Sequence, residues 1–203
     1  MADKKEVYSK KAMEVFKQNG LRLSIEEIAE KIGVTKKTLY NHFSSKDDLL
    51  SYCMHGFVAD INKAADIMTS DEINAIEGLY RGIFQMGNYF QTLSPRFFFD
   101  LKKTAPELAS TEHSAGFNFF LGDVINNLKK GKKEWLYRPE INEELIGQYF
   151  VYSLVSFFMN RVLNNIDIKS SDYFREIVDY HLHSVTTEKG RAILAAAKQK
   201  IKI

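Results

Sequence analysis

The sequence predicts an all-α protein with two helical parts, and three observations support this fold class. The chain of 203 residues contains only three prolines and eleven glycines, which leaves little material for hairpin turns. Apolar residues recur at helical spacing along long stretches. Capping residues stand where these stretches begin, and glycines stand where several of them end. With 45% hydrophobic residues, the chain can bury a substantial core.

Two helices are predicted before residue 34. The first contains the stop signal Asn19-Gly20 after an apolar stripe formed by Tyr8, Ala12, Val15 and Phe16. The second begins at Ser24, because Ser24 and Glu27 have the spacing of a capping box, in which each side chain satisfies a free backbone amide at the helix start. This second helix is expected to end at Gly33.

A third short helix is predicted from Lys36 to about Phe43, with Thr35 as its N-cap, and a fourth is predicted to start near Lys46 after the capping serines Ser44 and Ser45. Two short helices that meet across a glycine-containing turn are typical of a helix-turn-helix module. In the third helix, Leu39 and Phe43 share a narrow apolar face. The opposite face carries the polar side chains of Lys36, Lys37, Tyr40 and Asn41, with the hydroxyls of Thr35 and Thr38 at the helix start.

This polar face suits DNA, because phosphates attract cations and helix N-termini, and base edges pair with donors and acceptors on a rigid support. The charge distribution points the same way: residues 1–46 have a net charge of +4, whereas residues 47–203 have a net charge of −2. The alternative is an ordinary solvated surface, since lysine and asparagine are common on any exposed helix. Periodicity and charge leave both interpretations open.

The segment around the third helix closely resembles the signature of the tetracycline-repressor (TetR) family. The similarity covers roughly residues 7–50 and centres on Thr38-Leu39-Tyr40-Asn41-His42-Phe43 followed by Ser45-Lys46-Asp47-Asp48-Leu49. A generic helix-turn-helix does not carry this run. The resemblance implies a sequence-specific transcription regulator that binds a double-stranded DNA operator as a homodimer, so it favours DNA binding over a solvated surface.

The resemblance also implies roles for individual side chains. The residues expected to contact the phosphate backbone are Thr35, Thr38, Tyr40 and His42, and those expected to reach bases or phosphates are Lys36, Lys37 and Asn41. Lys46 is expected to meet a phosphate at the start of the next helix. One position departs from the family pattern: relatives often carry a small residue where this chain has Lys37, so its long side chain can add a contact or change how closely the helix approaches DNA.

Residues 1–50 are predicted to form the DNA-binding domain, and residues 51–203 are predicted to form a helical domain for effector binding and dimerisation. Further helices are expected at residues 49–68, 71–91, 110–130, 142–163 and 172–185, with a possible last helix after residue 187. Between the second and third of these, a segment is expected to open at Pro95 and to break at Ala105-Pro106. Gly131 is expected to interrupt the helix predicted at residues 110–130. This number and order of helices is what the resemblance implies for the second domain.

The helices at residues 142–163 and 172–185 are expected to form the dimer interface, because the apolar series in the first of them exceeds one buried stripe: Leu145, Tyr149, Tyr152, Phe157 and Phe158. Aromatic residues are also dense between residues 84 and 158. Most such rings fill helical cores, but the cluster as a whole predicts a pocket for an apolar or aromatic small molecule, lined by Phe98, Phe117, Phe120, Tyr149 and Tyr152.

The cation run Lys129-Lys130-Gly131-Lys132-Lys133 has two interpretations. Lysines at the end of a helix complement its dipole and are usually solvated. A second contact with nucleic acid is the less favoured alternative.

Other function classes lack support in the sequence. No nucleophile–base pair, metal-ligand set or phosphate-binding glycine loop is present, so no catalytic residue, metal or cofactor is predicted. The single cysteine, Cys53, is expected to be packed, and no segment is apolar and long enough to span a membrane, so a cytoplasmic protein is expected. A helical enzyme with an aromatic substrate site, and a partner-binding module that no longer binds DNA, are the rival hypotheses to an effector-responsive repressor.

Overall fold

The computed structural model describes residues 3–104, 115–164 and 170–200; within these ranges, the side chains at positions 98, 102, 115–119, 158–164, 170–172, 174 and 200 are not described. Helices dominate the described residues, and the only extended pairing among them is an isolated bridge between Tyr137 and Thr186. The prediction of an all-α fold is confirmed. No described helix is both long and apolar enough to cross a membrane.

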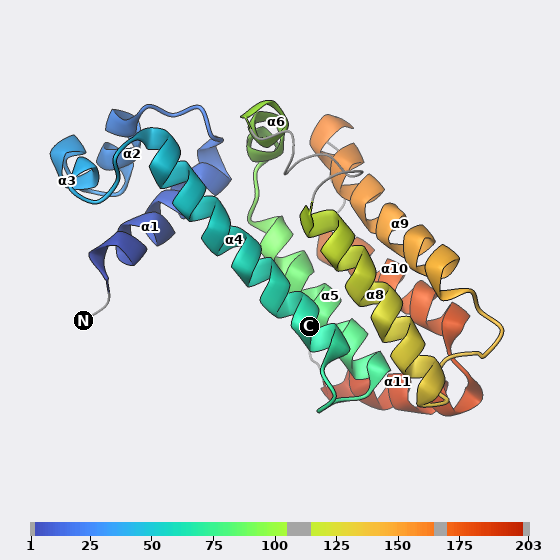
Figure 1. The fold of residues 1–203 in the computed structure, drawn as a ribbon. Coiled ribbons are helices and arrows are strands. Elements are labelled where there is room, and N and C mark those ends of the chain that lie inside the picture. The colour runs from blue at the N-terminus through green and yellow to red at the C-terminus, as the bar shows by residue number, and fades with distance from the viewer. Residues whose placement is uncertain (1–2, 105–114, 165–169, 201–203) are drawn as a thin grey trace. The chain divides into compact units, whose positions relative to one another are not determined.

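The chain forms two compact units, and the N-terminal unit comprises residues 1–60 and 92–114. Its helices are α1 (Lys4–Asn19), α2 (Ile25–Lys31), α3 (Lys36–Tyr40), α6 (Pro95–Thr104) and the first part of α4 (Lys46–Thr69). In this unit α1 packs against both α2 and α6, and α2 packs against α3 (Figure 1). The predicted domain boundary at residue 50 therefore falls inside α4, and α6 joins the N-terminal helices from a distant part of the sequence.

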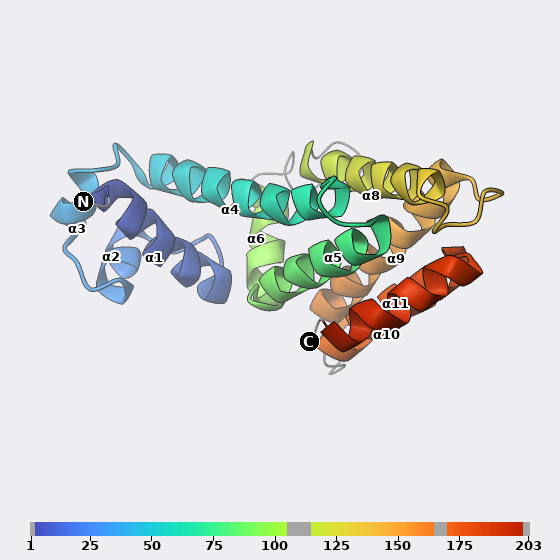
Figure 2. The ribbon, with the colours of Figure 1, turned by 90° about the horizontal axis from the view of Figure 1, so that it is seen from below.

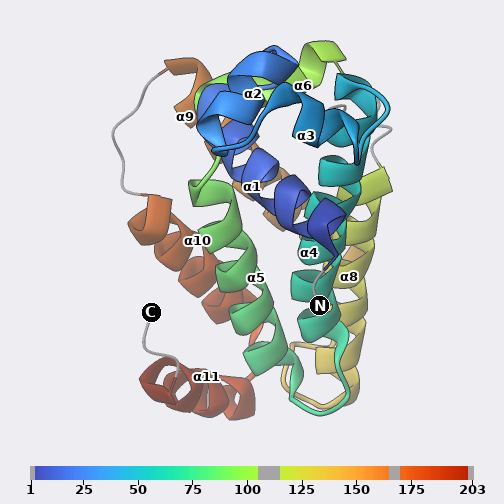
Figure 3. The same ribbon diagram turned by 90° about the vertical axis from the view of Figure 1, so that its left-hand side faces the viewer.

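The C-terminal unit comprises residues 61–91 and 115–203. It contains the end of α4 and the helices α5 (Ala75–Gln91), α8 (Ala115–Lys133), α9 (Glu143–Asn164), α10 (Ser170–Val185) and α11 (Glu188–Lys200). Helix α5 contacts α8, α10 and α11, and α9 contacts α8 and α10 (Figure 3). Helix α11 lies across one end of α5 (Figures 1 and 3). Their apolar faces form one continuous core.

Gly131 does not interrupt α8, which continues to Lys133, so that prediction is wrong. A Cβ atom at position 131 would lie 2.0 Å from the ring of Tyr137, and the glycine therefore lets this ring pack directly against the helix backbone. Tyr137 is fully buried, and its hydroxyl donates a hydrogen bond of 3.1 Å to Asn127 Oδ1. Close packing, rather than helix termination, explains the glycine.

Asn127 joins three segments of the C-terminal unit. Its side chain is completely buried, and its Nδ2 donates to the carbonyl oxygens of Met68, at 2.6 Å, and Ala75, at 2.8 Å. The Met68 carbonyl lies in the last turn of α4, where backbone oxygens lack an intrahelical partner, and the Ala75 carbonyl lies at the start of α5. With the hydroxyl of Tyr137 on its oxygen, the Asn127 amide is satisfied on both sides.

Candidate DNA-binding surface

The helix-turn-helix is positioned by the local signals that the sequence predicts. Ser24 and Glu27 form the expected capping box at the start of α2, and the Thr35 hydroxyl accepts a hydrogen bond of 3.1 Å from the backbone N–H of Thr38 at the start of α3. Between the helices, Gly33 has a φ of +75°, a left-handed conformation that a residue with a side chain rarely adopts. The turn that connects α2 to α3 therefore depends on this glycine.

Helix α3 is shorter than predicted: it ends at Tyr40 rather than near Phe43. The next residues continue as a tight turn, in which the backbone N–H groups of His42 and Phe43 both donate to the carbonyl oxygen of Leu39. Because of this turn, Leu39 and Phe43 are still buried together under the module, as their spacing predicts. The apolar side of α3 is thus packed, and the opposite side is available.

The side chains predicted to contact DNA differ in exposure. The exposed residues on or beside α3 are Thr35, Lys36, Lys37, Tyr40 and Asn41. Thr38 is half-buried, and its hydroxyl lies 2.8 Å from that of Thr35. Seven of the eight predicted residues therefore lie within one short helix, its N-cap and the turn that follows it, and five of these seven are exposed.

Lys36 is held by two neighbours within the module. Its Nζ forms an ion pair with Glu26 on α2, and it lies 5.6 Å from the centre of the Tyr40 ring. The hydrogen bond between these two side chains lowers the pKa of Glu26 and raises the pKa of Lys36. Lys37 is exposed and forms no ion pair within the described part of the chain. The two adjacent lysines therefore start from different states, one paired with a carboxylate and one free.

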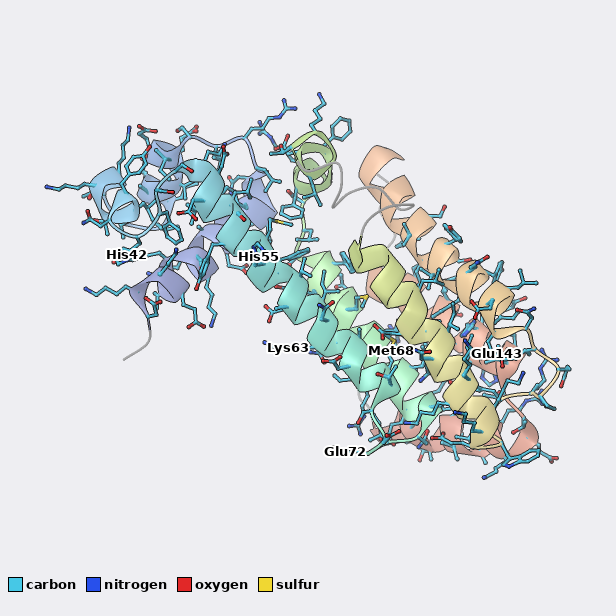
Figure 4. All side chains as sticks on the ribbon, viewed as in Figure 1. His42, His55, Lys63, Met68, Glu72 and Glu143 are labelled. Carbon is cyan, nitrogen blue, oxygen red and sulfur yellow. The ribbon has the colours of Figure 1, made fainter. Side chains whose placement is uncertain are left out.

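His42 and Lys46 lie at the far end of the predicted set. The half-buried His42 ring, marked in Figure 4, contacts the ring of Tyr8 on α1, with 5.2 Å between ring centres. Lys46 is the first residue of α4, next to a serine cap in which Ser45 Oγ accepts from the N–H of Asp48. The backbone N–H of Ser44 donates to the Asp48 carboxylate and lowers its pKa.

Two residues contribute to this surface although no sequence pattern predicts their contacts. Glu26 lies ten positions before Lys36, and no local pattern links the two. Lys5 lies over the rings of Phe43 and Tyr52, 5.2 Å and 4.9 Å from their centres, so α1 contributes a cation that supports the module. Both contacts arise between helices, and only the folded arrangement brings them together.

A sequence model of the family described as "Bacterial regulatory proteins, tetR family" matches residues 10–53, which contain α2, α3 and the start of α4. The chain belongs to the TetR family. The matched residues carry the helix-turn-helix DNA-binding module of this family.

Individual relatives support this assignment at low identity. The uncharacterised HTH-type transcriptional regulator YvaF of Bacillus subtilis is 27% identical over 90 residues, which cover 44% of this chain and 47% of YvaF. The transcriptional repressor KstR2 of Mycobacterium tuberculosis is 23% identical over 145 residues, which cover 68% of this chain and 71% of KstR2. The chain thus matches about half the length of the first of these curated relatives.

Solved structures show that the TetR fold extends over most of the chain. The structure of KstR2 covers 93% of this chain, with a TM-score of 0.59 and 17% identity, and the match spans 97% of that structure. SmeT, the repressor of a multidrug efflux pump of Stenotrophomonas maltophilia, covers 92% of this chain, with a TM-score of 0.65 and 18% identity over 92% of its own chain. The two-part helical architecture predicted from the resemblance is confirmed.

The five aromatic residues predicted to line an effector pocket of this TetR-family protein fall in different environments. Phe120 is buried in the core of the C-terminal unit, whereas Tyr149 and Tyr152 on α9 are 64% and 48% exposed. The side chains of Phe98 and Phe117 lie outside the described residues. The described members of this set therefore differ in burial, and their role in a pocket stays a prediction.

The helices predicted to form the dimer interface lie close to their expected bounds, at Glu143–Asn164 and Ser170–Val185. Phe157 is not part of an exposed face: it is buried and stacks on Tyr173, with 3.4 Å between ring centres. The side chain of Phe158 lies outside the described residues. Among the described side chains of α9, the large apolar ones that are exposed are instead Leu145, Tyr149 and Tyr152.

Three of the four lysines in the run at the end of α8 are engaged within the C-terminal unit, and the fourth, Lys133, is exposed. Lys129 pairs with Glu144 at 3.1 Å, and Lys132 pairs with Glu143 at 2.9 Å. Lys130 donates to the carbonyl oxygen of Ile73 at 2.6 Å and to that of Ser70. These lysines therefore join α8 to its neighbours, which argues against both a freely solvated cluster and a second contact with nucleic acid.

Proposed function

We propose that this protein is a homodimeric repressor that binds a palindromic operator through α3 and is released by a small apolar or aromatic effector. The observation that carries the proposal is the one-sided chemistry of α3. Leu39 is completely buried on one side, while Lys37 and Asn41 are exposed on the other, on a helix thin enough to enter a major groove. The repressor KstR2 is similar over most of its length, which supports the direction of regulation.

The exposed apolar side chains of α9 support a dimer. Leu145, Tyr149 and Tyr152 follow one another at i, i+4 and i+7 and so lie on one face, and Tyr180 on the neighbouring α10 is 70% exposed. A surface of this kind on two packed helices fits a four-helix contact with a second copy, in which the same residues meet around a twofold axis. This exposure favours Tyr149 and Tyr152 as interface residues over pocket residues.

A twofold dimer implies a palindromic operator. Each subunit presents one α3, so the two half-sites must be related by the same axis and separated by about one helical turn of DNA or a multiple of it. An effector weakens binding only if it binds the DNA-incompetent arrangement more tightly. A solved complex of SmeT with triclosan supports an aromatic effector for this chain, because SmeT shares its fold.

The operator is testable with fluorescence anisotropy on DNA from the gene's own upstream region. We expect salt-sensitive, sequence-selective binding, which the variant Lys37→Ala/Asn41→Ala weakens on the operator but not on random DNA. Addition of hydrophobic compounds should release the operator in at least one case. Equal affinity for operator and random DNA would contradict the proposal.

The dimer is testable with light scattering on the purified protein at micromolar concentration. Tyr149→Glu places a charge in the proposed interface and should give a monomer. Trp135→Glu is the matched control, because Trp135 is 73% exposed and lies outside α9 and α10. A wild-type monomer, or a Tyr149→Glu variant that remains dimeric, would show that this face is not the interface.

A further inference from the structure

We propose that a hollow in the N-terminal unit, between α6 and the connection from α1 to α2, binds a small, multiply charged anion that carries a planar ring, such as a nucleoside diphosphate. The hollow has a volume of about 350 Å³, which is within the range of small-molecule sites. Its lining is dominated by cationic side chains and one ring: Arg22, Pro95, Arg96, Phe99, Asp100 and Lys103. None of these lining residues belongs to the set predicted to contact DNA or to the set predicted to line the effector pocket.

One arginine and one lysine on α6 supply positive charge that is not paired within the described part of the chain. Arg96 and Lys103 are seven residues apart and therefore lie on the same face of the helix. Both are exposed, and neither forms an ion pair within the described part of the chain. Because these two cations lie two helical turns apart on one face and lack carboxylate partners among the described residues, an anion with more than one charge can pair with both.

The single carboxylate of the hollow is already occupied. Asp100 is buried; its Oδ1 pairs with Arg22 Nε at 2.8 Å, and its Oδ2 accepts from the backbone N–H of Leu21 at 2.9 Å. The pair with Asp100 uses Nε of Arg22, so the two terminal nitrogens of the guanidinium remain available for a ligand. Arg22 is thereby held in place, which lowers the entropic cost of binding an anion.

Phe99 adds the selectivity for a planar group. Its ring lies between the two cations in the α6 sequence and is 55% exposed, so its face is open to a ligand. An exposed aromatic ring beside guanidinium groups is the arrangement that stacks a base while cations hold its phosphates. A simple inorganic anion would leave this ring unused.

DNA itself is the less favoured occupant. Within the N-terminal unit, α6 and α3 lie at opposite ends (Figures 1 and 2). A duplex that contacts α3 along its groove would not reach a hollow on the far side of the same unit. The recessed form of the site also fits a small ligand better than a convex DNA backbone.

Isothermal titration calorimetry of the full chain at low ionic strength tests the site with pyrophosphate, ADP and adenosine. We expect pyrophosphate to bind, ADP to bind more tightly, and adenosine to show no binding at about 1 mM. The variant Arg96→Gln/Lys103→Gln should weaken both anions by about 10-fold or more. Phe99→Ala should weaken ADP by about 10-fold and leave pyrophosphate unchanged.

The matched control is Lys133→Gln/Arg191→Gln, which removes one exposed lysine and one exposed arginine from the C-terminal unit. It should leave both affinities unchanged. The proposal is overturned if neither anion binds, or if the control weakens binding as much as the α6 variant. An unchanged ADP affinity in Phe99→Ala would remove the planar ring from the proposal. If Arg96→Gln/Lys103→Gln instead weakens operator DNA as much as Lys46→Ala does, these cations serve the DNA backbone, and the site is not a small-anion site.

Discussion

Lys37 and Lys46 carry the same charge but are placed differently, so their removal should have different consequences for DNA binding. Lys37 lies on the free face of α3, is exposed, and forms no ion pair among the described residues. Lys46 is half-buried at the first position of α4, beside the Ser45 cap. The position of Lys37 suits contact with base edges, and the position of Lys46 suits contact with a phosphate next to a helix N-terminus.

The expected magnitudes follow from these positions. Lys37→Ala should cost about 1–3 kcal/mol per half-site on the operator and change the preference at one or two base pairs. Lys46→Ala should weaken all sequences similarly. Because a dimer loses one phosphate contact in each of two subunits, the slope of log K against log salt should become shallower by roughly 2.

The assay is binding to a library of operator variants at several salt concentrations, with Lys133→Ala as a control for the loss of an exposed lysine elsewhere. The control should change neither the base preference nor, by more than a small amount, the salt slope. If Lys37→Ala keeps the relative base preferences of the wild type, Lys37 is a phosphate contact, and its assignment to base recognition is refuted.

Three further predictions concern the same chain. Glu26→Gln should tighten DNA binding by about 0.3–1 kcal/mol per half-site, measured by anisotropy, because it releases Lys36 from an exposed ion pair; weaker binding would show that Glu26 positions Lys36 for DNA. Burial lowers the pKa of His181 to about 3, so the free energy of unfolding should be highest above pH 6.5 and fall by about 1.4 kcal/mol per pH unit as the pH drops toward 3. Urea denaturation should show that His181→Leu removes this contribution, and an unchanged slope would contradict it. Trp135 has a φ of +61° and is 73% exposed, so thermal denaturation should find Trp135→Asn more stable by about 1 kcal/mol and Trp135→Val less stable. A higher stability of the valine variant would refute the argument from backbone strain.

Local sequence was sufficient for the helix-turn-helix. The capping box at Ser24, the cap at Thr35 and the left-handed glycine at position 33 act within four residues of the groups that they satisfy, so their spacing is visible in the chain. The same holds for the division of α3 into a buried and an exposed side, because helical periodicity alone places Leu39 opposite Lys37. The approximate bounds of α9 and α10 followed from the same periodicity.

Contacts between distant segments could not be predicted in this way. A glycine such as Gly131 is typical of a helix end. Only the structure shows that the helix continues and that the ring of Tyr137 packs against this glycine. The pairing of Glu26 with Lys36 and the burial of Phe157 against Tyr173 depend on how helices pack, and so does the union of α6 with the N-terminal helices through Asp100 and Leu21. Periodicity shows that a side chain faces other protein, whereas its partner is set by the packing of helices whose order in space the local sequence does not encode.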